Sequence, residues 1–168
     1  MFVDETWAST NMTPLRGRSP RGQRCVGLTP HGHWMTSTFV GALRSSSLAA
    51  PMVVDGPIDG AMFVEWVRTF LSRELVPGDI VVMDNLSSHK VAGVREAIES
   101  AGAHLLYLPA YSPDLNPIEQ VFSKLKTLLR RASARTVDAL HDAVACILES
   151  FTPTECRNYI TAAGYGAS

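Results

Sequence analysis

At residues 80–84 the chain reads Ile80-Val81-Val82-Met83-Asp84, four apolar residues followed by a carboxylate. An unbroken apolar run of strand length is typical of a strand that is covered on both faces, as in a parallel sheet. A buried carboxylate needs partners, and open α/β sheets place their ligands at the carboxyl ends of parallel strands. The stretch therefore predicts a central strand with a functional group at its end.

Helical patterns lie on both sides of this strand. Before it, apolar residues recur at helical spacing from Met62 to Leu71, with Asp59 as a candidate N-cap and Pro77-Gly78 as the stop. After it we expect a second helix, with Ser88 as its cap. This helix carries Val91, Val94, Ile98 and Ala101 on one face. A further strand follows over residues 105–108. This alternation of strands and helices indicates an α/β fold.

The N-terminal part reads as strands. Phe2-Val3 lead into Asp4, and further strands are expected at residues 25–28, 34–43 and 51–56. Three helices close the chain, and their predicted starts are Asn116-Pro117, Thr136 and the capping box Thr152-Pro153-Thr154-Glu155. With no long linker or internal repeat, residues 1–168 are expected to form a single domain with one mixed sheet. The short segment before Asp4 suggests an excised domain or one reading frame of a longer element.

Composition restricts the class of protein. The hydrophobic share is 46% over 168 residues, which is typical of a globular domain and excludes a disordered chain. No apolar run is long enough to span a bilayer, and no secretion signal is recognisable, so a cytoplasmic location is expected. Three cysteines without CxxC spacing are interpreted as reduced thiols.

Charge permits nucleic-acid binding without demonstrating it. The net charge is −1, whereas DNA-binding domains are usually basic. Basic residues nevertheless gather in two places, and either cluster could also be an ordinary solvated surface. The first contains Arg16, Arg18, Arg21 and Arg24, and the second contains Lys124, Lys126, Arg130, Arg131 and Arg135.

Three carboxylates are candidates for one site. Asp84 ends the central strand, although it could instead cap the turn at Asn85. Glu119 lies near the start of a helix, at the edge of its apolar stripe. Asp4 ends another apolar strand segment. Two strand-borne aspartates and a helix-borne glutamate could converge on a pair of Mg²⁺ or Mn²⁺ ions, which prefer oxygen ligands.

Such a pair of ions would serve phosphodiester chemistry. Two cations about 3.5–4 Å apart can activate a water molecule or a 3′-hydroxyl and stabilise the leaving oxygen. Lys126 and Arg130 lie on the same helical face as Glu119, where they could contact a phosphate backbone. The alternative is a surface helix with ordinary charges.

Other polar residues are interpreted as structural. Asp55, Asp59, Asp79 and Asp114 stand in turn or cap contexts. His31, His33, His104 and His141 have no partner at metal-ligand spacing. Glu5 follows Asp4 on a strand, so its side chain should point to the opposite face, and it is not counted as a metal ligand.

Three segments resemble transposases of the mariner superfamily and the related bacterial insertion sequences. They are Val3-Asp4-Glu5-Thr6, then Met83-Asp84-Asn85-Leu86-Ser87-Ser88-His89, and then Tyr111-Ser112-Pro113-Asp114-Leu115-Asn116-Pro117-Ile118-Glu119. Thirty-four residues separate Asp84 from Glu119, which is a spacing characteristic of that family. The resemblance runs from Val3 to about Arg131 and is weakest in the last two helices.

The resemblance implies a ribonuclease H-like fold, with a mixed five-stranded sheet flanked by helices. Asp4 on the first strand, Asp84 on the fourth and Glu119 on the helix after the fifth would form a metal-binding Asp-Asp-Glu triad that holds Mg²⁺ or Mn²⁺. Asn85, His89 and Asn116 would shape the site, and Arg16, Arg18, Lys126 and Arg130 would contact DNA.

The implied partners are double-stranded DNA, with terminal inverted repeats and a TA target, and a second copy of the chain. The implied location is a bacterial cytoplasm, in association with the nucleoid. Members of the family usually carry N-terminal helix-turn-helix modules, which this sequence lacks. The product of an upstream reading frame is therefore a candidate partner.

Two other functions compete with a transposase that cleaves element ends and transfers strands. One is a ribonuclease H-like nuclease without strand transfer. The other is an inactive or domesticated fragment that only binds DNA. The intact triad counts against decay, while the missing N-terminal module counts in its favour.

Overall fold

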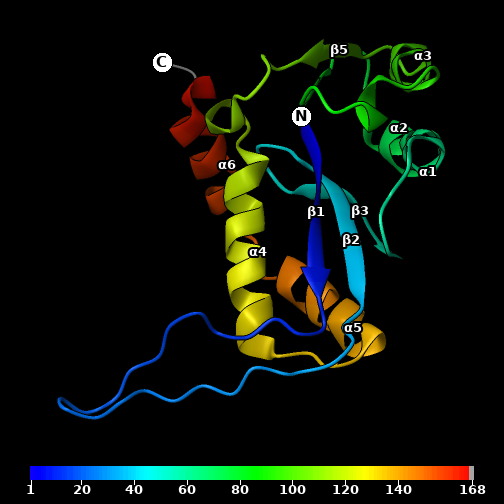
Figure 1. Ribbon diagram of the computed structural model, residues 1–168. Coiled ribbons are helices and arrows are strands. Elements are labelled where there is room, and N and C mark those ends of the chain that lie inside the picture. The colour runs from blue at the N-terminus through cyan, green and yellow to red at the C-terminus, as the bar shows by residue number, and fades with distance from the viewer. Residues whose placement is uncertain (167–168) are drawn as a thin grey trace.

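The computed structural model describes residues 1–166 and contains one mixed sheet of five strands (Figure 1). Their order across the sheet is β3-β2-β1-β4-β5. The strand bounds are β1 (Phe2–Ser9), β2 (Thr36–Leu43), β3 (Leu48–Asp55), β4 (Ile80–Met83) and β5 (His104–Tyr107). The predicted fold class is therefore confirmed.

The sheet combines an antiparallel and a parallel part. Strands β1, β2 and β3 pair antiparallel, as expected for neighbours joined by direct connections, whereas β4 and β5 pair parallel to each other. The two parts meet where β1 pairs parallel to β4. This contact consists of two residue pairs, Phe2 with Val82 and Val3 with Met83.

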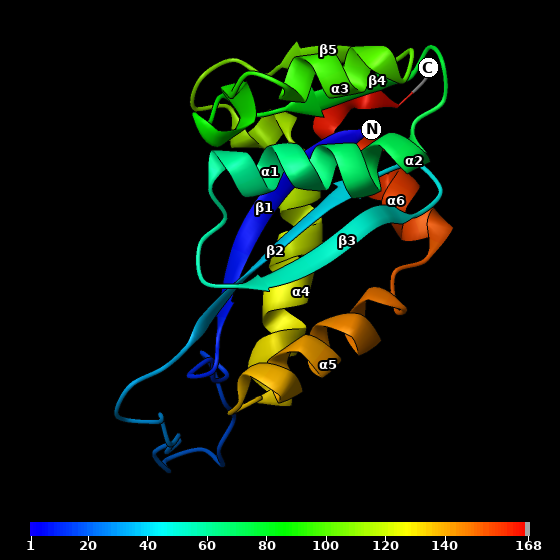
Figure 2. The same ribbon diagram turned by 90° about the vertical axis from the view of Figure 1, so that its right-hand side faces the viewer.

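Helices cover both faces of the sheet (Figure 2). One layer contains α1 (Gly60–Trp66), the π-helical segment η1 (Val67–Leu71), α2 (Ser72–Glu74) and α3 (Val94–Ser100). The other contains α4 (Ile118–Ala132), α5 (Val137–Leu148), α6 (Pro153–Ile160) and the π-helical segment η4 (Thr161–Tyr165). Short 3₁₀ turns η2 (Ser88–Lys90) and η3 (Pro113–Leu115) lie in the connections. Within the described residues, no helix has the length and apolar character needed to cross a membrane.

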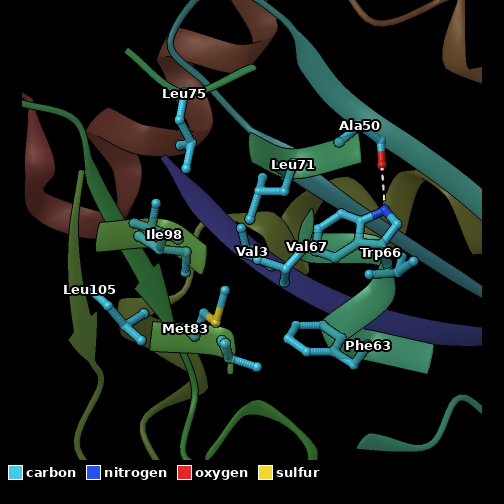
Figure 3. Packing of buried hydrophobic residues seen from close by; sticks show 14 of the residues in the cluster. Val3, Ala50, Phe63, Trp66, Val67, Leu71, Leu75, Met83, Ile98 and Leu105 are labelled. Carbon is cyan, nitrogen blue, oxygen red and sulfur yellow. Dashed lines mark hydrogen bonds between the residues drawn. The ribbon is translucent and has the colours of Figure 1, made fainter. Parts of the chain in front are cut away.

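Each layer encloses its own core. In the first, Phe63 and Trp66 lie against the sheet together with Val3 and Met83 (Figure 3). The Trp66 indole N–H donates a hydrogen bond of 3.0 Å to the carbonyl of Ala50, which satisfies its polar atom. On the opposite face, the apolar stripe of α4 packs on the even-numbered residues of β1, including Phe2. Alternation along β1 therefore sends its side chains into different cores.

The predicted helix starts are largely confirmed. The Asp59 carboxylate accepts from the Met62 N–H at 2.8 Å, Thr136 caps α5, and Thr152 and Glu155 form the capping box of α6. The expected Ser88 cap is wrong, because residues 88–90 form a 3₁₀ turn instead. Helix α3 begins after Gly93, whose φ of 103° is a backbone conformation that favours glycine.

An arm between β1 and β2 projects from the sheet (Figure 1). Residues 10–35 contain no helix or strand, so the strand expected at residues 25–28 is wrong. Val26 and Leu28 are 77% and 90% exposed, and β-forming residues give no strand without a neighbouring strand to pair with. Arg135 fixes the base of the arm by donating to the carbonyls of Thr10 and Met12.

We expect Leu71→Ala to destabilise the protein by about 2–5 kcal/mol, because it leaves a cavity where α1 and η1 pack on the sheet. Phe70→Ala is the matched control, since Phe70 is 43% exposed while Leu71 is fully buried. Its effect should stay below about 1 kcal/mol. Urea unfolding followed by circular dichroism measures both, and equal effects would contradict the described packing.

Candidate active site

A cleft of about 380 Å³ opens beside the carboxyl end of β4 and the first turn of α4. It collects residues from three distant parts of the sequence. Its lining consists of Asp4, Asp84, Asn85, Leu86, Leu108, Pro109, Ala110, Tyr111, Ser112, Pro113, Asn116 and Glu119. The structure thus brings the three predicted carboxylates to one cavity.

Strand register explains why Asp4 and Asp84 are neighbours. Val3 pairs with Met83 in the parallel β1–β4 contact, so each aspartate is the next residue along its own chain. Residues at equivalent positions of parallel strands point to the same face of the sheet, and neighbouring strands lie about 4.8 Å apart. The pairing therefore brings two carboxylates together at the carboxyl end of β4.

Asp4 is a buried carboxylate. Its Oδ1 accepts from the backbone N–H of Glu5, and its Oδ2 accepts from the Asn116 side-chain amide, both at 2.8 Å. Burial raises the pKa of Asp4 to about 7, although the Glu5 N–H opposes this effect. No Lys, Arg or His of the described residues forms an ion pair with Asp4. Asp4 is thus a buried acid without an ion pair among the described residues.

Asp84 is partly exposed, and one of its carboxylate oxygens contacts Leu86 and His89. Its Oδ1 accepts from the Leu86 N–H at 2.9 Å and lies 2.7 Å from Nδ1 of His89. The latter contact is a close ion pair that lacks the direction of a good hydrogen bond. Burial would raise the pKa of Asp84, but the His89 ring and the Leu86 N–H outweigh it and lower the pKa. Asp84 therefore stays ionised at neutral pH.

His89 is fully buried and touches two carboxylates. Its Nε2 lies 2.5 Å from Oε2 of Glu5, and its ring packs on Phe63 with centroids 4.4 Å apart. Burial lowers the pKa of His89, but Asp84 and Glu5 raise it further, to about 9. Donor atoms of Asp4, Glu5 and His89 lie within 4.8 Å of one another. Both ring nitrogens are already close to carboxylate oxygens, of Glu5 and of Asp84.

Glu5 is a residue that sequence reasoning passed over. Strand alternation predicted that it points away from Asp4. Glu5 does not line the cleft, but one of its carboxylate oxygens lies within 4.8 Å of the Asp4 carboxylate. Its partner His89 belongs to a turn far along the chain, so only the folded structure brings the two together. A carboxylate next to Asp4 was the one signal available in the sequence.

Glu119 and the two asparagines complete the cleft. Glu119 is exposed in the first turn of α4. Asn85 donates from its side chain to the Leu108 carbonyl at 2.5 Å, which ties the end of β4 to the end of β5. Asn116 is buried, and within the described residues its Oδ1 has no hydrogen-bond partner. Both asparagines therefore line the cleft.

The predicted cations lie in two separate places. Lys126 and Arg130 follow Glu119 along α4, and burial lowers the pKa of Lys126 while Glu119 opposes the shift. The Lys126 ammonium lies 4.9 Å from the ring centroid of Trp7, an exposed tryptophan that the sequence did not single out. Arg16 and Arg18 are exposed on the arm and do not line the cleft.

The rim of the cleft carries a strained residue. Tyr111 is fully exposed and has a φ of 57°, a left-handed conformation that is uncommon for a bulky residue. It lies in the loop between β5 and η3, within the long motif that ends at Glu119.

Comparisons with known proteins agree with this geometry. A family model described as "DDE superfamily endonuclease" matches residues 1–141. The transposable element Tc1 transposase of Caenorhabditis elegans is 30% identical over an alignment of 141 residues, which covers 77% of this chain and 50% of that protein. The chain thus spans about half the length of this curated relative.

Solved structures share the fold. The Mos1 transposase paired-end complex with left transposon end aligns with a TM-score of 0.74 at 19% identity, over 95% of this chain and 50% of that one. The catalytic domain of Mos1 mariner transposase aligns with a TM-score of 0.66 at 16% identity, over 95% and 74% of the two chains. The predicted ribonuclease H-like arrangement is confirmed by this likeness. Together with the family match, it shows that the chain belongs to the DDE superfamily endonucleases and has the fold of a mariner transposase catalytic domain.

Proposed function

We propose that this chain is the catalytic domain of a cut-and-paste DNA transposase, which cleaves DNA at the ends of its element and joins the ends to target DNA. One observation carries the proposal. Asp4, Asp84 and Glu119 come from β1, the end of β4 and the start of α4, and they line a single cleft in a chain of the DDE family.

The donor set of this cleft fits divalent metal ions. An ionised carboxylate that is buried without an ion pair is unfavourable in the metal-free protein, and burial raises the pKa of Asp4 to about 7. Carboxylate oxygens are the ligands that Mg²⁺ and Mn²⁺ prefer. Solved Mos1 paired-end complexes contain Mg or Mn. We infer that Asp4, Asp84 and Glu119 hold Mg²⁺ or Mn²⁺, as two ions.

The chain's own residues would prepare the site for phosphodiester chemistry. Bound ions would supply the Lewis acidity that activates water or a 3′-hydroxyl and stabilises the leaving oxygen. Asn116 and the Glu5 N–H hold the Asp4 carboxylate in one orientation, and the Leu86 N–H holds Asp84. Lys126 and Arg130 lie further along α4 on the same helical face as Glu119, and there they would bind the phosphate backbone of DNA.

The same proposal names the partners. Double-stranded DNA with terminal inverted repeats would be the substrate and a TA step the target. The Mos1 structures are paired-end and strand-transfer complexes, which supports assembly of two copies of this chain across paired ends. A helix-turn-helix module, for example from an upstream reading frame, would supply end recognition. In a bacterial cell, this activity would place the protein at the nucleoid.

Asp84→Asn should abolish Mn²⁺-dependent nicking of supercoiled plasmid. The loss should exceed about a hundredfold, the upper end for residues that only orient metal ligands. Asp142→Asn is the matched control, because Asp142 is exposed on α5 and forms no side-chain hydrogen bond or ion pair with the described residues. Equal nicking by Asp84→Asn and wild type would contradict the proposal. If Asp84→Asn does lose nicking, an assay for strand transfer of a pre-cut end distinguishes a transposase from a simple nuclease, which does not join ends to a target.

The pKa of Asp4 makes metal binding dependent on pH. Because burial raises this pKa to about 7, an ion that binds Asp4 below pH 7 has to displace a proton. We expect Mn²⁺ affinity to rise with pH up to about 7 and then to level off. Calorimetry in two buffers of different ionisation enthalpy should detect about one proton released per chain at pH 6 and fewer at pH 8. Release that does not decrease over this range would contradict the role of Asp4.

The arm arginines should contribute to DNA affinity through phosphate contacts. Replacing Arg16 and Arg18 together by Ala should lower the slope of log affinity against log salt by about 2, since each phosphate contact contributes about 0.9. Arg73→Ala combined with Arg95→Ala is the matched control, because both residues are exposed, on α2 and α3, and lie outside the arm. Fluorescence anisotropy with a labelled duplex measures both slopes. An unchanged slope in the arm variant would exclude these contacts.

A further inference from the structure

His89 lies between two carboxylates that belong to different parts of the fold. Its Nε2 faces Glu5 of β1 at 2.5 Å, and its Nδ1 faces Asp84 at 2.7 Å. Both nitrogens of one ring thus lie within 2.7 Å of a carboxylate oxygen. The ring thus connects Glu5, which is outside the cleft, to Asp84, which lines it.

The imidazole has no freedom to turn. It is 0% exposed and packs against the ring of Phe63 at an interplanar angle of 34°. The Tyr107 hydroxyl donates to the His89 carbonyl at 2.9 Å, which ties the turn to β5. Glu5 is in turn approached by the Ser88 hydroxyl at 3.5 Å. Strand β1, turn η2 and strand β5 therefore fix the ring together.

A fixed ring determines how Asp84 presents its carboxylate. Its Oδ1 is engaged by the Leu86 N–H and faces His89, whereas no described residue donates a hydrogen bond to Oδ2. Because Asp84 lines the cleft, the free oxygen is the one available to a cation there. Groups behind a metal ligand commonly set its orientation in this way.

Packing alone gives no reason for this arrangement. A buried ion pair often stabilises a fold no better than apolar residues of similar volume, because desolvation offsets the attraction. The Phe63 ring that packs on His89 belongs to an apolar core, which could accommodate such a replacement. A polar ring at this position is explained by its contact with Asp84.

We propose that Glu5 and His89 form a positioning pair that orients the Asp84 carboxylate for divalent metal binding. Glu5 fixes the orientation of the His89 ring, and the His89 ring fixes the orientation of the Asp84 carboxylate. Neither residue is a metal ligand in this scheme. The inference rests on the proposed function, since it assumes that Asp84 binds the metal.

The test is Mn²⁺ affinity of the whole chain, measured by calorimetry without DNA. Glu5→Ala and His89→Gln should each weaken binding by about 10- to 100-fold, the range for residues that orient ligands. Glu5→Gln should recover most of the affinity, because its amide oxygen can still accept from the His89 Nε2–H. His141→Gln is the matched control, since His141 pairs with Asp55 at 3.3 Å away from the cleft, and it should bind as wild type does.

Thermal unfolding of each variant separates positioning from a structural role. A purely structural pair would lower stability while the folded chain kept its Mn²⁺ affinity. If His89→Gln does not fold, the comparison of Glu5→Ala with Glu5→Gln decides, because Glu5 is less buried.

Two negative results have different meanings. Affinities of Glu5→Ala and His89→Gln within about twofold of wild type would overturn the inference and leave the proposed function standing, provided that Asp84→Asn loses binding. Normal Mn²⁺ binding by Asp84→Asn would instead remove Asp84 from the metal site, and it would overturn both proposals.

Discussion

Two residue pairs join the halves of this sheet, and the active site depends on them. Phe2 pairs with Val82 and Val3 pairs with Met83, and beyond these pairs β1 and β4 separate. The register of this short parallel contact makes Asp4 and Asp84 adjacent. A shift by one residue would send each side chain of β1 to the opposite face, so Glu5 would replace Asp4 at the cleft. The apolar side chains secure the register, because Val3 and Met83 belong to one core and Phe2 to the other.

The resulting site concentrates negative charge, and the protein manages it in three different ways. Asp4 is buried, and its raised pKa allows it to take up a proton in the absence of metal. Asp84 remains ionised because His89 stands behind it. Glu119 is exposed to solvent in the first turn of α4, where a helix favours negative charge. A folded domain tolerates such a local arrangement when its two cores supply the stability, and functional sites are the usual place for it.

The wider architecture separates support from contact with a substrate. Both helical layers bury their apolar faces against the sheet, and the cleft opens at the carboxyl end of β4, beside the start of α4. The arm of residues 10–35 extends away from both cores and carries exposed arginines (Figure 1). Trp7 and Lys126 are placed between the cleft and the arm along β1 and α4. The distribution of charge over these surfaces is therefore more informative than the net charge of −1.

Local rules in the sequence determined much of this molecule. The unbroken apolar run fixed β4 at residues 80–83, and the caps at Asp59, Thr136 and Thr152 located three helices, because a side chain and the backbone a few residues away decide those features. The resemblance of three motifs to transposases likewise singled out Asp4, Asp84 and Glu119, which the cleft brings together.

Tertiary structure decided the rest. Residues 25–28 have strand-forming side chains but find no neighbouring strand, and Ser88 turns towards Glu5 instead of capping a helix. The pairing of Glu5 with His89, and of Lys126 with Trp7, joins residues more than eighty positions apart. Such contacts depend on how whole elements pack, and no local pattern in a sequence records which partner a side chain will meet.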